Sequence, residues 1–232
     1  MRAEASVLSY PILLLHPALM VLNKPAGLPV HSGPGGKPSL EAWLPGLQMG
    51  KRHLPQPAHR LDTDTAGCLV LGRTKPALAA LGALFAAGAV AKTYWAVTRG
   101  GPAGESGEVS LPLLKHSTKA AGWRMIPDPA GQSAVTGWRV LGRGDGLCWL
   151  EFTPRTGRTH QLRVHAAAAL GGAILGDPVY GKAGGGLHLL ARRIGFDWPD
   201  GDSPGGRIEV EAPVPEHMRA AIAACSTRAP PP

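Results

Sequence analysis

Glycine and proline interrupt this 232-residue chain along its whole length, and they restrict its helices and strands to short segments. The sequence holds 32 Gly and 23 Pro, spread throughout rather than gathered in one tract. Both residues mark turns, because glycine adopts backbone conformations closed to other residues and proline lacks a main-chain N–H donor. Hydrophobic residues make up 44% of the chain, as in an ordinary globular protein. We therefore expect many short elements around a substantial core.

The apolar runs between these turns predict strands and helices that are mixed without a regular β–α–β rhythm. Five runs predict strands, near residues 18–23, 65–71, 91–98, 135–141 and 147–152. One helix is expected to be capped by Thr74 and to end at Gly88. A second is expected over residues 159–170, with two glycines as its stop, and residues 31–37 read as a flexible loop. This mixture predicts an α+β fold.

Length and cysteine usage predict one intracellular domain. The chain fits a single domain over residues 1–225, with a Pro-rich and disordered tail over residues 226–232. Its three cysteines form no CxxC pair, which argues against zinc and disulfides and favours a reducing compartment. Residues 6–22 are apolar, but prolines interrupt them, so that they predict neither a signal peptide nor a membrane span. We expect a cytoplasmic monomer without an obligate protein partner.

The charge balance favours a polyanionic partner. The chain has 24 Lys and Arg against 16 Asp and Glu, a formal net charge of +8, and a pI near 9.8. Each phosphate that a basic surface neutralises releases condensed counterions, which drives binding to nucleic acid. From charge alone, nucleic-acid binding and a basic protein without such a partner remain equal alternatives.

Acidic residues are scarce in the first half of the chain, which draws attention to two of them. Residues 5–104 contain only Glu41, Asp62 and Asp64 as acids, and Asp62 follows Arg60 closely. A carboxylate beside an arginine stays ionised at neutral pH and can act as a nucleophile or a base. The same pattern also fits a surface salt bridge, which is the commoner case.

A second group of polar residues lies at the expected start of the second helix. Five basic residues crowd into eleven positions: Arg155, Arg158, His160, Arg163 and His165. A helix N-terminus offers free N–H groups and a positive dipole end, so we expect a phosphate site there, with a solvated basic face as the alternative. The two histidines are five residues apart, the wrong spacing for a two-histidine metal face. Tyr94, on an expected strand, fits either core packing or base stacking.

Four segments in series resemble the motifs of the RluA-type pseudouridine synthases. They are residues 22–27 (LNKPAG), 59–67 (HRLDTDTAG), 92–97 (KTYWAV), and 156–165 with 172–181 (TGRTHQLRVH and GAILGDPVYG). Residues 187–196 and 212–213 are similar to the family's closing segments. The departures are Ala66, where the family usually has Ser, and Cys68, in place of an aliphatic residue. The first motif begins too early for the small N-terminal RNA-binding domain of many relatives, so we expect the catalytic domain to choose the substrate.

The resemblance implies a mixed, mainly antiparallel sheet with a central catalytic cleft flanked by helices and loops. It implies that Asp62 is the catalytic aspartate, that Tyr94 stacks on the flipped uracil and that Arg163 pairs with Asp62. Arg60 would help to extrude the base or fill the gap that it leaves. We also expect contacts with the RNA backbone from Lys24, Arg158 and His160.

The implied activity converts uridine to pseudouridine in ribosomal or transfer RNA, a redox-neutral reaction that needs no cofactor and no metal. Whether Asp62 acts as nucleophile or base is left open. Two other functions fit parts of the sequence. One is a non-catalytic RNA-binding protein, which the charge supports. The other is a metal-dependent phosphodiesterase that uses His59, Asp62 and Asp64, although such sites need more carboxylates than the chain offers here.

Overall fold

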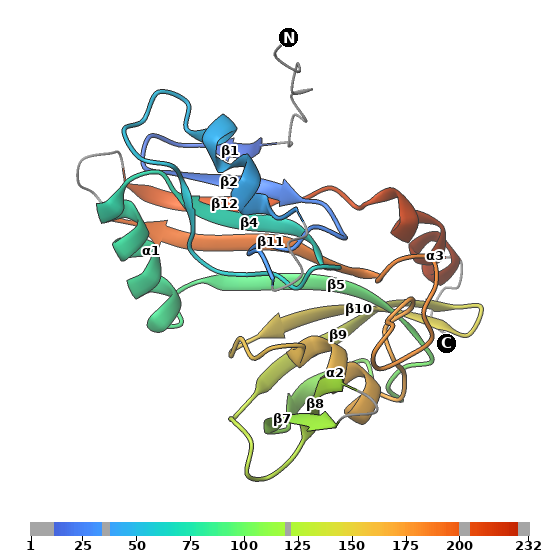
Figure 1. The fold of residues 1–232 in the computed structure, drawn as a ribbon. Helices are drawn as coiled ribbons and strands as arrows, with labels where there is room; N and C mark the ends of the chain where they lie inside the picture. Colours follow the sequence, from blue (N-terminus) through green and yellow to red (C-terminus); the bar gives the residue numbers. More distant parts are fainter. Residues whose placement is uncertain (1–11, 34–37, 119–121, 200–204, 227–232) are drawn as a thin grey trace.

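The computed structural model describes residues 12–33, 38–118, 122–199 and 205–226. Most of its strands form one large sheet (Figure 1). Ten strands form it: β1 (Ile12–Leu15), β2 (Leu19–Lys24), β3 (Gln56–Pro57), β4 (Ala66–Gly72), β5 (Ala91–Arg99), β6 (Ser106–Ser110), β9 (Val135–Gly144), β10 (Leu147–Pro154), β11 (Leu189–Trp198) and β12 (Gly206–Glu211). A separate hairpin holds β7 (Leu113–Thr118) and β8 (Gly122–Pro127). The helices are the 3-10 helix η1 (Leu40–Leu47), α1 (Lys75–Ala86), α2 (Gln161–Ala169) and α3 (Glu216–Ser226).

The strand order explains how distant motifs meet. The main path runs β1-β2-β4-β11-β5-β10-β9-β6, while β12 pairs with β11 and β3 pairs with β4. Within the described residues every pairing in this sheet is antiparallel except that of β4 with β11. The expected α+β class with a mixed, mainly antiparallel sheet is confirmed.

The parallel contact between β4 and β11 requires a glycine. Gly67 has φ +110°, and a Cβ atom there would lie 2.3 Å from the carbonyl oxygen of Ala191 on β11. Any other residue would both strain the backbone and push the two strands apart. This close approach gives a physical reason for the glycine that ends the 59–67 motif.

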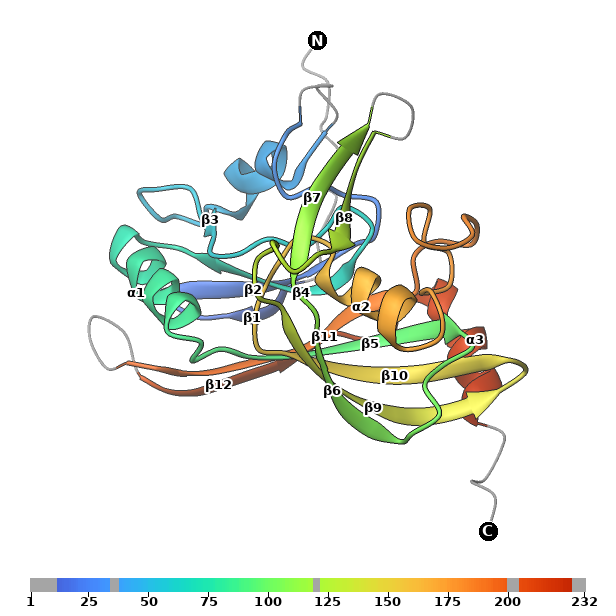
Figure 2. The same ribbon diagram turned by 90° about the horizontal axis from the view of Figure 1, so that it is seen from below.

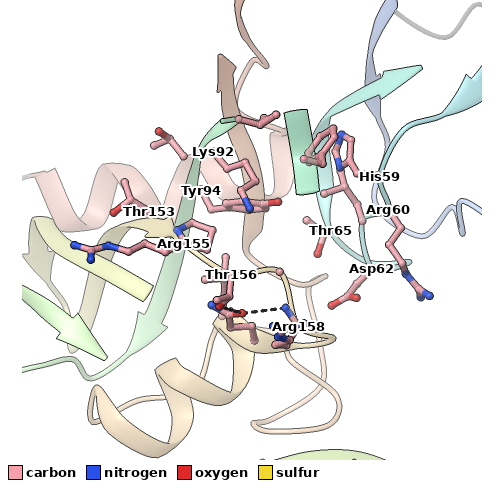
Figure 3. A pocket seen from close by; sticks show the side chains of 18 of the residues that line it. His59, Arg60, Asp62, Thr65, Lys92, Tyr94, Thr153, Arg155, Thr156 and Arg158 are labelled. Atoms are coloured by element: carbon pink, nitrogen blue, oxygen red, sulfur yellow. Dashed lines mark hydrogen bonds between the residues drawn. The ribbon is translucent and has the colours of Figure 1, made fainter. Parts of the chain in front are cut away.

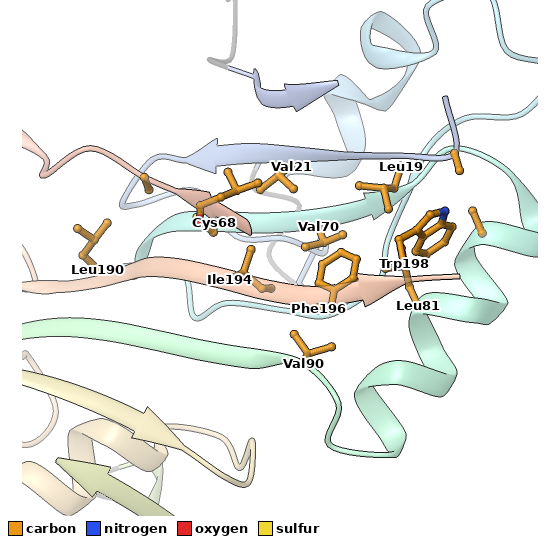
Figure 4. Packing of buried hydrophobic residues seen from close by; sticks show 14 of the residues in the cluster. Leu19, Val21, Cys68, Val70, Leu81, Val90, Leu190, Ile194, Phe196 and Trp198 are labelled. Atoms are coloured by element: carbon orange, nitrogen blue, oxygen red, sulfur yellow. The ribbon is translucent and has the colours of Figure 1, made fainter. Parts of the chain in front are cut away.

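Two apolar clusters lie on opposite faces of β2 and β4. Leu19 and Val21 join the cluster that Figure 4 shows, in which Phe196 of β11 and Leu81 of α1 also pack. The alternate β2 residues pack on the other face against leucines of η1. Burial on both faces explains why this strand reads as a continuous apolar run rather than an alternating one. Each fully buried leucine there contributes about 1.5–3 kcal/mol.

Two helices cover opposite faces of the strands β5 and β10. Ala96 of β5 shares a cluster with Leu162 and other apolar residues of α2, whereas Val97 packs with Ala221 and Cys225 of α3. The alternation of β5 therefore places Tyr94 and Ala96 on the α2 side of the sheet. Figure 2 shows α2 and the β7–β8 hairpin rising from this side, which holds the cleft described below.

Helix α1 forms as its sequence predicts. The Oγ1 atom of Thr74 accepts a hydrogen bond from the N–H of Ala77 (3.2 Å), and Gly88 follows the helix with φ +70°. Helix α2 is shorter than expected, beginning at Gln161 instead of Thr159. The reason is that His160 has a left-handed backbone (φ 54°), which a helix cannot include.

The predictions for the chain ends and one loop are only partly covered by the structure. Ser226, expected in a disordered tail, is the last residue of α3, and its Oγ donates to the carbonyl of Ile222 (3.0 Å). Residues 227–232 and residues 34–37 of the predicted loop lie outside the described residues. Within the described residues, no helix is long and apolar enough to cross a membrane.

Candidate active site

A cleft of about 990 Å³ opens between the loop that precedes β4 and the segment that leads into α2 (Figure 3). Residues 59–62 and Thr65 form one wall, and residues 153–158 and 160–163 form the opposite one. Lys92 and Tyr94 of β5 lie between them. The cleft therefore brings together three of the four sequence motifs.

The loop of the first wall is fixed by its neighbours. The Nε2 atom of His59 accepts a hydrogen bond from the N–H of Val70 (3.0 Å), and its ring packs on Phe85 at 4.7 Å between centroids. Leu61 is buried in the cluster beneath η1. The main-chain oxygen of Asp62 accepts from the N–H of Thr65 (3.1 Å). These contacts hold the Asp62 side chain, which is 20% exposed, toward the cleft.

His59 should make the protein sensitive to mild acid. Burial, helped by the charge of Lys92, lowers the pKa of His59 from 6.5 to about 4. Between these values the unfolded chain binds the proton and the folded protein does not, so stability is lost as the pH falls from 6.5 toward 4. The loss from this group is at most about 3 kcal/mol.

Urea unfolding at pH 7 and pH 4.5 tests this sensitivity. Wild type should lose more stability between the two values than His59→Gln does, whereas His53→Gln, which changes an exposed histidine, should behave as wild type. Equal losses in wild type and His59→Gln would show that His59 is not buried in its neutral form.

Two basic side chains of the second wall face Asp62. The Nη1 atom of Arg163 lies 3.6 Å from Oδ2 of Asp62, and Nε2 of His160 lies 3.9 Å from the same oxygen. Burial lowers the pKa of His160, and the nearby Asp62 carboxylate opposes this shift. The pairing of Arg163 with Asp62 that the resemblance implied is therefore present in the geometry, although its role in the reaction stays a prediction.

The principal partner of Arg163 is Asp177, to which the sequence analysis gave no role. The Nε and Nη2 atoms of Arg163 donate to the two carboxylate oxygens of Asp177 at 2.8 and 2.7 Å, and both side chains are buried. Asp177 also accepts from the N–H groups of Val179 and Tyr180. Burial would raise the pKa of Asp177, but the hydrogen bonds from Arg163 and the backbone hold it below its usual value.

This bidentate pair fixes the guanidinium plane and leaves Nη1 directed at Asp62. Asp177 is thus a positioning residue. The sequence does hold a signal that points to Asp177. It is the only acidic residue between positions 152 and 196, a stretch rich in arginine.

Tyr94 and Lys92 line the cleft from the same face of β5. Burial, and then the negative charge of Asp62, raises the pKa of Tyr94, which keeps its hydroxyl protonated at neutral pH. Burial lowers the pKa of Lys92. Figure 3 shows both side chains reaching into the space opposite Asp62. Sequence reasoning named Tyr94 but assigned no role to Lys92.

The start of α2 differs from the expected cluster of five basic groups. His160 is held by Tyr180, whose hydroxyl lies 2.9 Å from Nδ1. His165 does not reach the cleft, because it is fully buried between Thr136 and the carbonyl of Leu111. Its inclusion in the expected phosphate site is therefore wrong.

The three other predicted RNA contacts fall in different places. Arg60 and Arg158 are exposed at the rim of the cleft, where Nε of Arg158 donates to the carbonyl of Ser133 (3.0 Å). Lys24 is 0% exposed, and its ammonium group donates to the carbonyls of Pro25, Leu28 and Thr63 at 2.9, 2.7 and 2.9 Å. The expected contact of Lys24 with the RNA backbone is contradicted, since all three donors are used inside the protein.

Lys24 instead joins the loop after β2 to the loop that carries Asp62. Replacing it with methionine should destabilise the fold by at least about 2 kcal/mol, because three buried carbonyls lose their charged donor. Affinity for RNA, measured on the folded variant, should not change. The exposed Lys182→Met serves as the control for stability. Weaker RNA binding at unchanged stability would instead mean that Lys24 contacts phosphate.

Among the described residues, no three His, Cys, Asp or Glu side chains converge as ligands for a metal ion. His59, one of the three residues of the phosphodiesterase alternative, uses Nε2 to accept from Val70 and packs on Phe85. Asp64 does not line the cleft.

Comparison with known proteins defines the class that this fold and cleft belong to. The model of the RNA pseudouridylate synthase family matches residues 18–168. An uncharacterised RNA pseudouridine synthase of Zymomonas mobilis is 46% identical over 176 residues, covering 76% of this chain and 80% of that protein. Ribosomal large subunit pseudouridine synthase D of the same organism is 34% identical over 220 residues, covering 87% and 68%.

A solved structure agrees with these relatives. Human RNA pseudouridylate synthase domain-containing protein 4 superposes with a TM-score of 0.76 at 27% identity, covering 95% of this chain and 94% of that one. The protein is thus an RNA-modifying isomerase. It belongs to the RNA pseudouridylate synthase family, and within it to the RluA type.

Proposed function

We propose that this enzyme isomerises specific uridines in structured ribosomal or transfer RNA, with Asp62 as the catalytic group and the target base flipped into the cleft. The observation that carries the proposal is the Asp62 carboxylate, which projects into the cleft and faces Nη1 of Arg163 at 3.6 Å. A carboxylate in this position can attack a sugar carbon or remove a proton.

The reaction breaks the bond between N1 of uracil and C1′ of ribose and forms a bond from C5 of uracil to C1′. The hydrogen of C5 leaves as a proton and N1 gains one, so that no oxidant or reductant is needed. Between these steps the detached uracil must stay in the cleft and turn. Tyr94, half-buried opposite Asp62, offers the flat surface against which the ring could stack.

The position of the carboxylate supports base flipping. Asp62 is only 20% exposed inside a cleft of about 990 Å³, which is large enough for a nucleotide but not for a base that stays in a duplex. Flipping costs a few kcal/mol and favours loops and bulges. Arg60, exposed at the rim, is placed to fill the gap, and Arg158, exposed on the opposite wall, is placed to contact the backbone. His160 is not placed for the backbone contact expected of it, because its side chain is 11% exposed and its two ring nitrogens face Tyr180 and Asp62.

The enzyme is proposed to act as a cytoplasmic monomer formed by one domain over residues 1–225, without a cofactor. Its three cysteines are buried and unpaired, which fits a reducing compartment. A role in RNA binding alone is disfavoured, because a binding surface does not require Asp62, Arg163 and Asp177 to be held together inside a cleft.

Pseudouridine maps of ribosomal and transfer RNA test this proposal. In cells that lack the gene, we expect pseudouridine to be missing at one or a few positions. A wild-type copy should restore them, and an Asp62→Asn copy should not. Unchanged maps in the deletion strain would contradict a role in modifying these RNAs.

A further inference from the structure

The β7–β8 hairpin leaves the large sheet and leans over the start of α2 (Figure 2). Its base is anchored in a small cluster, in which Leu113 and Met125 pack with Val164 of α2 and with Tyr180. The N–H of Met125 also donates to the hydroxyl of Tyr180 (3.0 Å). Because Tyr180 in turn holds His160, the hairpin is tied directly to one wall of the cleft.

Trp123 of this hairpin carries an unusual exposed surface. Its indole stacks on the imidazole of His160, with 5.1 Å between centroids and 27° between planes, yet the residue remains 47% exposed. Lys115, from the neighbouring strand, places its ammonium group 5.2 Å from the ring centroid. A tryptophan beside a cation, with much of its ring open to solvent, has the form of a stacking site for a nucleotide.

A short, continuous path of contacts joins Trp123 to Asp62. The indole contacts His160, and Nε2 of His160 lies 3.9 Å from the carboxylate of Asp62. Only one imidazole ring therefore separates Trp123 from the catalytic aspartate. A nucleotide next to a uridine that is flipped toward Asp62 is therefore the part of the RNA placed to meet the indole.

We propose that Trp123 is a stacking platform for an unpaired base next to the target uridine, and that Lys115 supports it by neutralising the backbone there. This inference rests on the proposed function and narrows its substrate. The enzyme then requires a target in a loop or bulge with at least one unpaired neighbour, since a base paired in a helix cannot lie on the indole. Loss of such a stacking contact weakens binding by roughly 5- to 150-fold.

The test is a double-mutant cycle between the protein and the RNA. The RNA is a stem-loop that contains a uridine mapped in vivo, made intact and with an abasic nucleotide on its 5′ or its 3′ side. Dissociation constants are measured with the full chain carrying Asp62→Asn, which blocks turnover, with and without Trp123→Leu. Leucine keeps an apolar contact with His160 but cannot stack on a base.

We expect the abasic nucleotide on one side to weaken binding by roughly 5- to 150-fold when Trp123 is present. With Trp123→Leu the intact RNA should bind as weakly, and the abasic nucleotide should cause no further loss. Trp123→Phe should retain most of the affinity. Leu114→Ala, at an exposed position of β7, is the matched hairpin control and should bind as wild type.

Two results would overturn the inference. One is unchanged affinity in Trp123→Leu, and the other is an equal penalty for the abasic RNA with and without the indole. Failure of the proposed function would appear differently, as the absence of pseudouridine after the same intact RNA is incubated with the wild-type enzyme.

Discussion

Asp62→Asn should lower the rate of pseudouridine formation by about a thousandfold or more, with RNA affinity close to that of wild type. Asparagine preserves the shape of the side chain but removes the charge that faces Arg163, and a neutral amide can neither attack the sugar nor accept its proton. Tritium release from RNA that contains 5-tritiated uridine, measured with enzyme in excess, reports the chemical step directly.

Asp64→Asn is the matched control for this change. Asp64 lies two residues farther along the same loop but does not line the cleft, so its replacement should alter the rate by no more than a few-fold. Wild-type turnover in Asp62→Asn, or an equal collapse in both variants, would show that the charge at position 62 has no special role.

Asp177→Ala should have the largest effect on stability. It leaves the buried guanidinium of Arg163 without its bidentate partner, and breaking a buried pair in this way costs about 3–5 kcal/mol. For a chain of this size the loss corresponds to a fall in Tm of roughly 10 °C. Activity should fall as well, because Arg163 is no longer held toward Asp62. Thermal unfolding and tritium release measure the two effects separately.

A second variant separates the structural role of this pair from its role in the reaction. Arg163→Met combined with Asp177→Ala removes both charges, so most of the stability should return while activity stays low. Arg219→Ala, which breaks an exposed pair with Glu216, is the control and should cost less than about 1 kcal/mol. Full activity in the double variant would mean that Arg163 only supports the fold.

Local signals predicted the elements of this fold that depend on neighbouring residues. Helix α1 has its cap at Thr74 and its stop at Gly88, and β2, β4 and β5 appear as apolar or alternating runs close to their observed bounds. Each of these patterns reflects burial or backbone geometry within a few neighbouring residues, so it can be recognised in the sequence alone.

Elements that depend on remote contacts could not be predicted in this way. Strand β11 lies between β4 and β5, yet it follows them by about a hundred residues, and its parallel pairing with β4 leaves no local pattern. The hairpin strands β7 and β8 are short and mostly exposed, because only one face packs against Tyr180 and Val164. Lys24 looked like an RNA contact, since nothing near it in sequence reveals that Thr63 supplies one of its acceptors.

In the candidate site, too, features set by local sequence could be predicted and features set by remote contacts could not. Residue chemistry alone left Asp62 as a salt-bridged acid or a catalyst, and the order of the motifs favoured the catalyst. What the motifs did not provide was the support around that acid. Asp177 and the Trp123 hairpin act through contacts with Arg163 and His160, and those contacts exist only in the folded chain.

Tritium release by the purified wild-type chain, in the presence of a chelator, tests most directly whether the Asp62 cleft isomerises uridine without a metal. The substrate is 5-tritiated ribosomal and transfer RNA from the deletion strain. We predict one tritium released for each target uridine, because the bond from C5 to C1′ replaces the bond from C5 to hydrogen. The absence of tritium release from every RNA, or equal release by Asp62→Asn, would contradict the proposal that the Asp62 cleft isomerises uridine.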